Sequence, residues 1–111
     1  MTDQATKVTL FGQNLNLNFD ATATDDQWNE LIDAVNDLSL YEVMLGETIT
    51  GACGYYTAGS GMMRIRNTQT NKVQVIEPLH MAKGQTYFSF SRPVKVNMYD
   101  VLEVFTTVAG S

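Results

Sequence analysis

The sequence predicts a mainly β fold: an antiparallel β-sandwich or barrel-like domain of about seven to nine strands with one amphipathic helix packed on it. Short segments in which apolar and polar residues alternate recur along the chain, at the roughly 8–12-residue spacing typical of such folds. Only residues 25–38 carry a clear helical periodicity. The 111 residues, 44% hydrophobic and 17% charged, fit a single globular domain.

The predicted helix begins after Thr24, in the segment TDDQWNELIDAVNDL. Thr24 and Gln27 have the spacing of a capping box. One stripe of the helix is apolar, made up of Trp28, Leu31, Ile32, Val35 and Leu38. We therefore expect Trp28 to be buried against a sheet. The opposite face is acidic and is either solvated or in contact with a basic partner; it carries Asp26, Asn29, Glu30, Asp33 and Asp37.

Strands are predicted on both sides of this helix. Residues 8–19 read as a hairpin around Gly12-Gln13, where glycine suits a type II′ turn. The preceding residues, 1–6, are polar and are expected to form a flexible arm. After the helix, residues 40–45 and 47–52 are each predicted to form a strand.

The second half of the chain predicts a hairpin and a closing set of strands. Residues 51–61 hold four of the eight glycines and read as a long loop or a bulged edge strand. Residues 62–66 and 72–76 form the hairpin, with Arg64 and Arg66 on one face and Met63 and Ile65 on the other. The closing strands are expected at residues 86–91, 94–98 and 101–108, with Glu103 pointing outward.

Charge is divided unevenly along the chain. Residues 1–47 hold nine acids against Lys7, a balance of −8, and residues 48–111 hold six bases against three acids, a balance of +3. The net charge of −5 argues against nonspecific nucleic-acid binding and against an anionic membrane surface. The division itself is explained either by neutralisation inside the fold or by head-to-tail contact between neighbouring copies.

A single cysteine, Cys53, excludes an internal disulfide, and nothing in the sequence requires an oxidising compartment. No signal-peptide pattern precedes residue 8, and no apolar run reaches the length of a membrane span. We expect the protein to be made in a cytoplasm.

No pattern in the sequence points to catalysis, a cofactor or a metal. His80 is the only histidine, and neither it nor Cys53 has a partner motif. The acids of residues 20–37 do not follow a calcium-loop pattern. We predict that the protein is not an enzyme; a small enzyme built on Cys53 or His80 is the least favoured alternative.

Contacts with another protein are the function that the sequence favours. Exposed aromatic and basic side chains are enriched at protein contacts. The candidate contact residues are Lys7, Phe11, Tyr55, Tyr56, Arg64, Arg66, Lys72, Tyr87 and Phe105, and the candidate contact segments are 1–12, 51–61 and 67–72. Two alternatives remain open: the aromatic residues cap a small core, or Tyr55, Tyr56, Tyr87 and Arg64 line a carbohydrate site.

Residues 83–108, KGQTYFSFSRPVKVNMYDVLEVFTTV, resemble the closing strands of small viral β-sandwich proteins. The chain is also similar to bacteriophage capsid decoration, or cement, proteins in its size, acidic charge, lone cysteine and polar N-terminal segment. The resemblance implies a structural protein on the outer surface of a phage head. Such proteins form homo-oligomers, often trimers, so the implied partners are the capsid protein and copies of the chain itself. The resemblance implies no catalytic residues.

Overall fold

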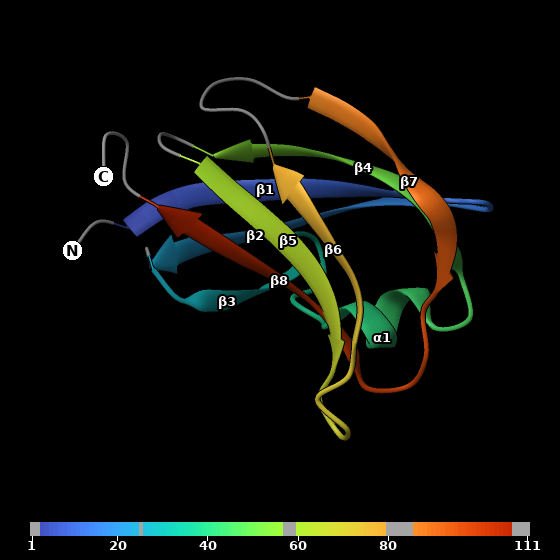
Figure 1. The fold of residues 1–111 in the computed structure, drawn as a ribbon. Coiled ribbons are helices and arrows are strands. Elements are labelled where there is room, and N and C mark those ends of the chain that lie inside the picture. The colour runs from blue at the N-terminus through green and yellow to red at the C-terminus, as the bar shows by residue number, and fades with distance from the viewer. Residues whose placement is uncertain (1–2, 25, 57–59, 80–85, 108–111) are drawn as a thin grey trace.

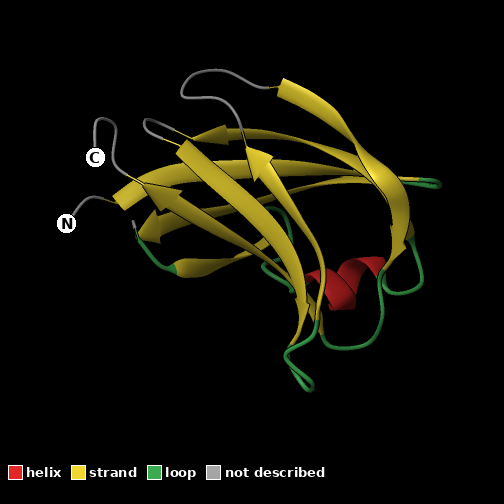
Figure 2. Ribbon diagram, viewed as in Figure 1, coloured by secondary structure: helices red, strands yellow, loops and turns green. Residues whose placement is uncertain are grey.

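A computed structural model gives the fold of the protein (Figures 1 and 2). The structure describes residues 3–24, 26–56, 60–79 and 86–107. Within these ranges the backbone alone is described for residues 3–5, 23, 54–56, 60, 76–79, 86–89, 91 and 107. The described elements are β1 (Asp3–Gly12), β2 (Asn16–Thr24), β3 (Trp28–Asp33), α1 (Leu40–Met44), β4 (Thr48–Tyr56), β5 (Ser60–Asn67), β6 (Val73–Leu79), β7 (Thr86–Lys95) and β8 (Asp100–Thr107).

The strands form one antiparallel sheet in the order β6-β5-β8-β3-β2-β1-β4-β7. The sheet curls until its two edge strands, β6 and β7, approach each other, so that it is nearly closed into a barrel (Figure 1). The predicted fold class, a mainly β barrel-like domain with one helix, is therefore confirmed. The gap between the edge strands is bridged by Gln74 of β6, whose Nε2 donates to the backbone oxygen of Lys95 in β7 at 3.3 Å.

The helix lies elsewhere than predicted, because residues 28–33 of the proposed 25–38 helix form strand β3. β3 pairs with β8 through residues 28–31 and with β2 through Ile32 and Asp33, so it joins the two halves of the barrel. Thr24 caps no helix; its N–H and C=O instead pair with the side-chain amide of Asn29 at 3.2 and 2.9 Å. A helix of this length is marginal alone, whereas two neighbouring strands satisfy the backbone of β3.

Residues 40–44, predicted as a strand, form the helix α1. Glu42 Oε1 accepts a hydrogen bond from the backbone N–H of Ser39 at 2.9 Å, which is the returning half of a capping box. Gly46 follows the helix with a φ of 81°, in the left-handed conformation that glycine adopts without strain. α1 lies at one end of the barrel, where it contacts β3 and β8 (Figure 2).

The two predicted hairpins are present with longer strands. β1 and β2 pair from residue 3, so residues 3–6, expected to be a flexible arm, belong to a strand. β5 and β6 pair around the predicted tip, and β6 continues through Pro78. Strand β7 likewise continues through Pro93. Both prolines lie in edge strands, where a missing N–H costs no ladder hydrogen bond on the open side.

Glu47 shapes the connection between β1 and β2. Its Oε2 accepts hydrogen bonds from the backbone N–H groups of Asn14 and Leu15 at 2.9 and 3.1 Å, and its Oε1 accepts from Asn14 Nδ2 at 2.8 Å. The turn therefore has three residues instead of the predicted two. A Cβ on Gly12 would lie 2.7 Å from Glu47 Cγ and Oε2, so the carboxylate can reach the turn only because residue 12 is glycine.

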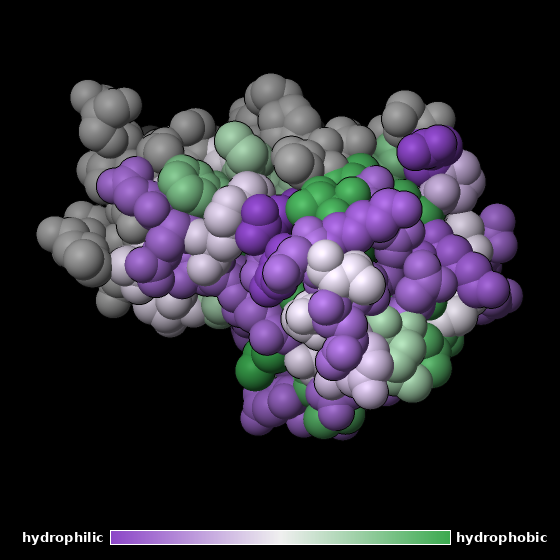
Figure 3. Space-filling view, turned by 60° about the horizontal axis from the view of Figure 1, so that its bottom comes forward, coloured by the Kyte–Doolittle hydropathy of each residue, from purple (hydrophilic) through white to green (hydrophobic). Residues whose placement is uncertain are grey.

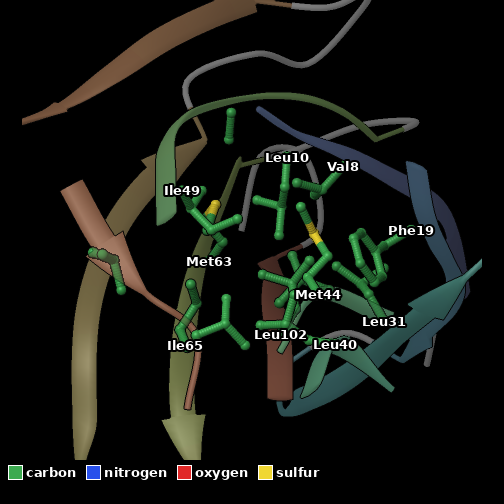
Figure 4. Packing of buried hydrophobic residues seen from close by; sticks show 14 of the residues in the cluster. Val8, Leu10, Phe19, Leu31, Leu40, Met44, Ile49, Met63, Ile65 and Leu102 are labelled. Carbon is green, nitrogen blue, oxygen red and sulfur yellow. The ribbon is translucent and has the colours of Figure 1, made fainter. Parts of the chain in front are cut away.

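The core fills the interior of the barrel (Figure 4). Leu40 and Met44 of α1 lie among Leu31 of β3 and Leu102 of β8, so the helix closes one end of the barrel. The buried hydrophobic residues of the core are Val8, Leu10, Phe19, Leu31, Leu40, Met44, Ile49, Ala52, Met63, Ile65, Phe90, Val94, Val96, Leu102 and Val104.

Candidate functional site

Three apolar side chains form a row across the outer face of β3, β8 and β5. Phe105 lies opposite Trp28 on one side and opposite Met62 on the other. The rings of Trp28 and Phe105 are 5.5 Å apart between centroids and inclined by 60°, and both are half-buried. Met62 is 40% exposed. The prediction that Trp28 is buried in the core is therefore wrong: its ring belongs to an apolar row on the surface.

An ionic row lies beside the apolar one. Glu103 of β8 lies opposite Arg64 of β5 and opposite Glu30 of β3. Its Oε1 accepts from Arg64 Nε at 2.7 Å and from Arg66 Nε at 2.9 Å, and its Oε2 accepts from Arg66 Nη2 at 2.9 Å. Arg66 Nη1 donates in turn to Asn71 Oδ1 at 2.8 Å. Glu103 lies on the outer face, as predicted, and is buried beneath its two arginines.

The guanidinium of Arg64 joins the two rows. Its Cζ lies 3.9 Å from the centroid of the Trp28 ring while its Nε is held by Glu103. A cation over an indole at this distance contributes about 0.5–1 kcal/mol at an exposed site. Trp28, Met62, Arg64 and Phe105 thus form one surface, which we call the outer patch, with Glu103 fixing its arginine from below.

Charge pairing sets the ionisation of this row. Burial raises the pKa of the Glu103 carboxyl, but the hydrogen bonds from Arg66 and Arg64 outweigh burial and hold the pKa below its usual range. The same hydrogen bond to Glu103 raises the pKa of Arg66, against the effect of burial, and the charge of Glu30 adds to it. Arg66 and Glu103 are therefore both charged at neutral pH.

The outer patch has the composition of a protein contact. Tryptophan, phenylalanine, methionine and arginine are enriched at such contacts, and tryptophan and arginine supply many of the residues that dominate binding energy. Arg64 is already held by Trp28 and Glu103, so a partner would not have to order it.

Of the predicted contact residues, the fold brings Arg64, Arg66 and Phe105 together at or beside the outer patch. Lys7 and Phe11 lie on β1, which is separated from the three strands of the outer patch by β2. Lys7 lines a pocket of about 260 Å³ with Thr9, Asn18, Phe19, Asp20 and Ala34. Phe11 is half-buried, and its carbonyl accepts from Thr50 Oγ1 at 3.1 Å.

The predicted tyrosines are placed by backbone only. Tyr55 and Tyr56 lie in β4, opposite Lys7 and Thr6, and Tyr87 lies in β7, opposite Cys53. The structure does not describe the side chains of these three tyrosines. Of the predicted 51–61 loop, residues 51–56 belong to β4, and residues 57–59 lie outside the described residues. The carbohydrate site stays a prediction.

Sequence reasoning missed Trp28, Met62 and Glu103 as members of this site. For Met62 the signal was present, because alternation along β5 puts it on the face of Arg64 and Arg66. For Glu103 the same signal was present, because alternation along β8 puts it on the face of Phe105. For Trp28 there was none, since its neighbours in this site come from strands far away in the sequence.

A polar pocket of about 280 Å³ lies between the start of β6 and the end of β7, beside the turn that joins β5 to β6. It is lined by Asn67, Thr70, Lys72, Val73, Gln74, Arg92, Asn97 and Asp100. Asp100 is fully buried, and its carboxylate accepts from Asn97 N at 2.8 Å, from Asn67 Nδ2 at 3.1 Å and from Gln74 Nε2. Figure 3, which turns this end of the molecule forward, shows a largely hydrophilic surface.

Groups for catalysis do not converge in the described part of the chain. Cys53 is half-buried in β4, and His80 lies outside the described residues. Among the described side chains, no group of three or more His, Cys, Asp or Glu residues is placed to hold a metal ion. No helix within the described ranges has the length and apolar character needed to cross a membrane.

Comparison of the chain with protein-family models, with curated proteins and with solved structures found no match.

Proposed function

We propose that the protein is a non-enzymatic structural virion component, a decoration protein that binds the outer surface of a phage head and stabilises it through the outer patch. The observation that carries the proposal is the registered row of Trp28, Phe105 and Met62 with Arg64 fixed above Trp28. The choice of a phage head as the partner rests on the resemblance of residues 83–108 to viral β-sandwich proteins.

The architecture of the patch supports a holding role. It lies on three hydrogen-bonded strands, β3, β8 and β5, whose inner faces carry core residues such as Leu31, Leu102 and Met63. Side chains on such a support keep their positions, so binding loses little conformational entropy. A rigid contact suits a protein that clamps neighbouring subunits.

The partner surface follows from the chemistry of the patch. The apolar row of Trp28, Phe105 and Met62 is complementary to an apolar depression or a protruding aliphatic side chain on the partner. Arg64 uses Nε for Glu103 and lies over Trp28, so its terminal nitrogens are the groups suited to a carboxylate at the rim. We expect a mixed contact, apolar at its centre and acidic beside Arg64.

The test is binding to empty shells assembled from the major head protein encoded in the same genome. The wild-type chain is expected to sediment with the shells and to raise their melting temperature. Trp28→Ala and Phe105→Ala are each expected to weaken binding at least about tenfold, as truncated anchors do.

Leu15→Ala is the matched control, because Leu15 is an exposed apolar residue, 41% accessible, in the β1–β2 turn away from the patch. Circular dichroism checks that each variant is folded. A wild-type chain that ignores the shells, or patch variants that bind as tightly as Leu15→Ala, would refute the proposal.

A further inference from the structure

Among the described side chains, no ion pair joins the two oppositely charged parts of the chain, although the charge of Glu30 in β3 acts on Arg66 in β5. Both ion pairs among the described side chains are made by Glu103, with Arg64 and with Arg66, and all three residues belong to the basic part, 48–111. No ion pair in the described structure joins that part to residues 1–47, which hold nine acids and one base. Within the described residues, direct ion pairs between the two parts therefore do not account for the division of charge, and contact between copies is the explanation that can be tested.

Uncompensated cations gather at the β6–β7 gap. Lys72 and Arg92 line the polar pocket there, and Lys95 lies beside it on β7. All three are exposed, and none has an ion-pair partner among the described residues. The one acid in the pocket wall, Asp100, is buried and takes three hydrogen bonds from uncharged donors. We call Lys72, Arg92 and the pocket between them the basic pocket.

An exposed turn whose one acid is Asp37 lies in the other part of the chain. Residues 34–38 between β3 and α1 are all exposed. Asp37 has a φ of 58°, its backbone N–H donates to the oxygen of Asp33, and its carboxylate has no partner among the described residues. Val35 beside it is 84% exposed. We call residues 34–38 the acidic turn.

We infer that the basic pocket of one copy binds the acidic turn of a second copy, with the Asp37 carboxylate between Lys72 and Arg92. Charge complementarity supports this occupant, because Asp37, Lys72 and Arg92 have no ion-pair partner among the described residues. The two surfaces differ, so the contact is heterologous and each copy can engage two others, in a ring or an open row. The inference goes beyond the proposed function and requires only the chain itself.

Light scattering on the full chain tests this contact over a wide range of concentration. In about 0.1 M salt, where the Debye length is about 10 Å, repulsion between copies of charge −5 is damped while direct contacts persist. The weight-average mass is expected to rise with concentration. In about 1 M salt, with a Debye length of about 3 Å, it is expected to return to that of the monomer.

Two neutralised variants make the test specific. Lys72→Gln with Arg92→Gln removes the basic pocket, and Asp37→Asn removes the acidic turn, so each variant alone is expected to stay monomeric. Their mixture retains one intact pocket and one intact turn, and is expected to form a pair that grows no further. Lys7→Gln, which changes an exposed lysine of β1 outside the pocket, should associate like the wild type.

A wild type that is monomeric at every concentration in 0.1 M salt would overturn the inference, as would association that salt leaves unchanged or a mixture of the two variants that stays monomeric. These outcomes are separate from those of the shell-binding test, which depends on Trp28 and Phe105. A monomeric chain that still binds shells would remove only the contact between copies.

Discussion

Gly12 shows how one absent side chain decides a turn. Glu47 closes the β1–β2 turn from the space that a Cβ on residue 12 would occupy, and the backbone oxygen of Leu15 lies 2.8 Å from the same point. We expect Gly12→Ala to lower the free energy of unfolding by about 1–3 kcal/mol, the usual cost of overpacking, as measured by urea denaturation.

Gly46→Ala is the matched comparison for that substitution. No atom lies within 4 Å of a Cβ on Gly46, whose φ is 81°, so its cost is conformational only, about 1 kcal/mol. If Gly12→Ala proved as stable as the wild type, Glu47 could not hold the turn as described.

The carboxylates of Glu47 and Glu103 make the fold sensitive to acid. Hydrogen bonds from the backbone and side chain of Asn14 lower the pKa of Glu47, and Arg66 and Arg64 lower that of Glu103 against the effect of burial. A lowered folded-state pKa means that the unfolded chain binds more protons near pH 4. Stability is then complete above the ordinary carboxyl value of about 4.3 and is lost as pH falls below it.

Glu103→Gln is expected to lower the free energy of unfolding at neutral pH by about 1.5–3 kcal/mol, the range for a hydrogen bond to a charged group. It should also flatten the dependence of stability on pH between about 5 and 3, because one titrating group of lowered pKa is gone. Urea denaturation over this pH range measures both effects. An unchanged slope would mean that Glu103 does not titrate through its pairing with the arginines.

At the scale of elements, β3 shows where local periodicity misleads. The spacing of Trp28, Leu31 and Val35 fits a helix, but the segment also contains adjacent apolar residues, Leu31 and Ile32, which a strand places on opposite faces. Pairing with β8 and β2 decided the outcome. β2 directly precedes β3, but β8 is distant in sequence, so no local pattern announces that partner.

A pair of substitutions distinguishes the strand from the helix. Leu31→Ala is expected to cost about 3–5 kcal/mol, since Leu31 is fully buried in the core. Val35→Ala should cost less than about 0.5 kcal/mol, as a surface change, whereas an amphipathic helix would bury both side chains. Urea denaturation gives both values, and comparable losses would support the helix.

Trp28 is the intermediate case. The ring is half-buried on the outer face and packs on Phe105 and Arg64, so Trp28→Ala is expected to cost about 1–2 kcal/mol, the sum of an aromatic pair and a cation–π contact. Urea denaturation measures it. A loss of about 3–5 kcal/mol, the value for a core aromatic, would place the ring in the interior.

The sequence did contain the signal for α1. Ser39 and Glu42 have capping-box spacing, and Gly46 stands where a helix-ending glycine is expected. The apolar residues of LYEVML, residues 40–45, also fit a strand, and that prediction was wrong. The hairpins of β1–β2 and β5–β6 could be predicted because adjacent strands with alternating residues carry their own pairing information.

For the whole molecule, fold class could be predicted while strand order could not. Composition and alternation indicate antiparallel strands, but the order β6-β5-β8-β3-β2-β1-β4-β7 depends on non-local pairing. The site divides in the same way. Arg64, Arg66 and Phe105 were predicted one by one as outward residues, whereas their meeting with Trp28 depends on β3 and β5 both lying beside β8.

Electron cryomicroscopy of head shells saturated with the protein tests the central claim most directly, because it shows which face meets the shell. We expect the outer face of β3, β8 and β5 to lie against the shell, with Trp28 and Phe105 within about 4 Å of its atoms, the distance of side-chain contact. A decorated shell in which these two rings point to solvent would contradict the account.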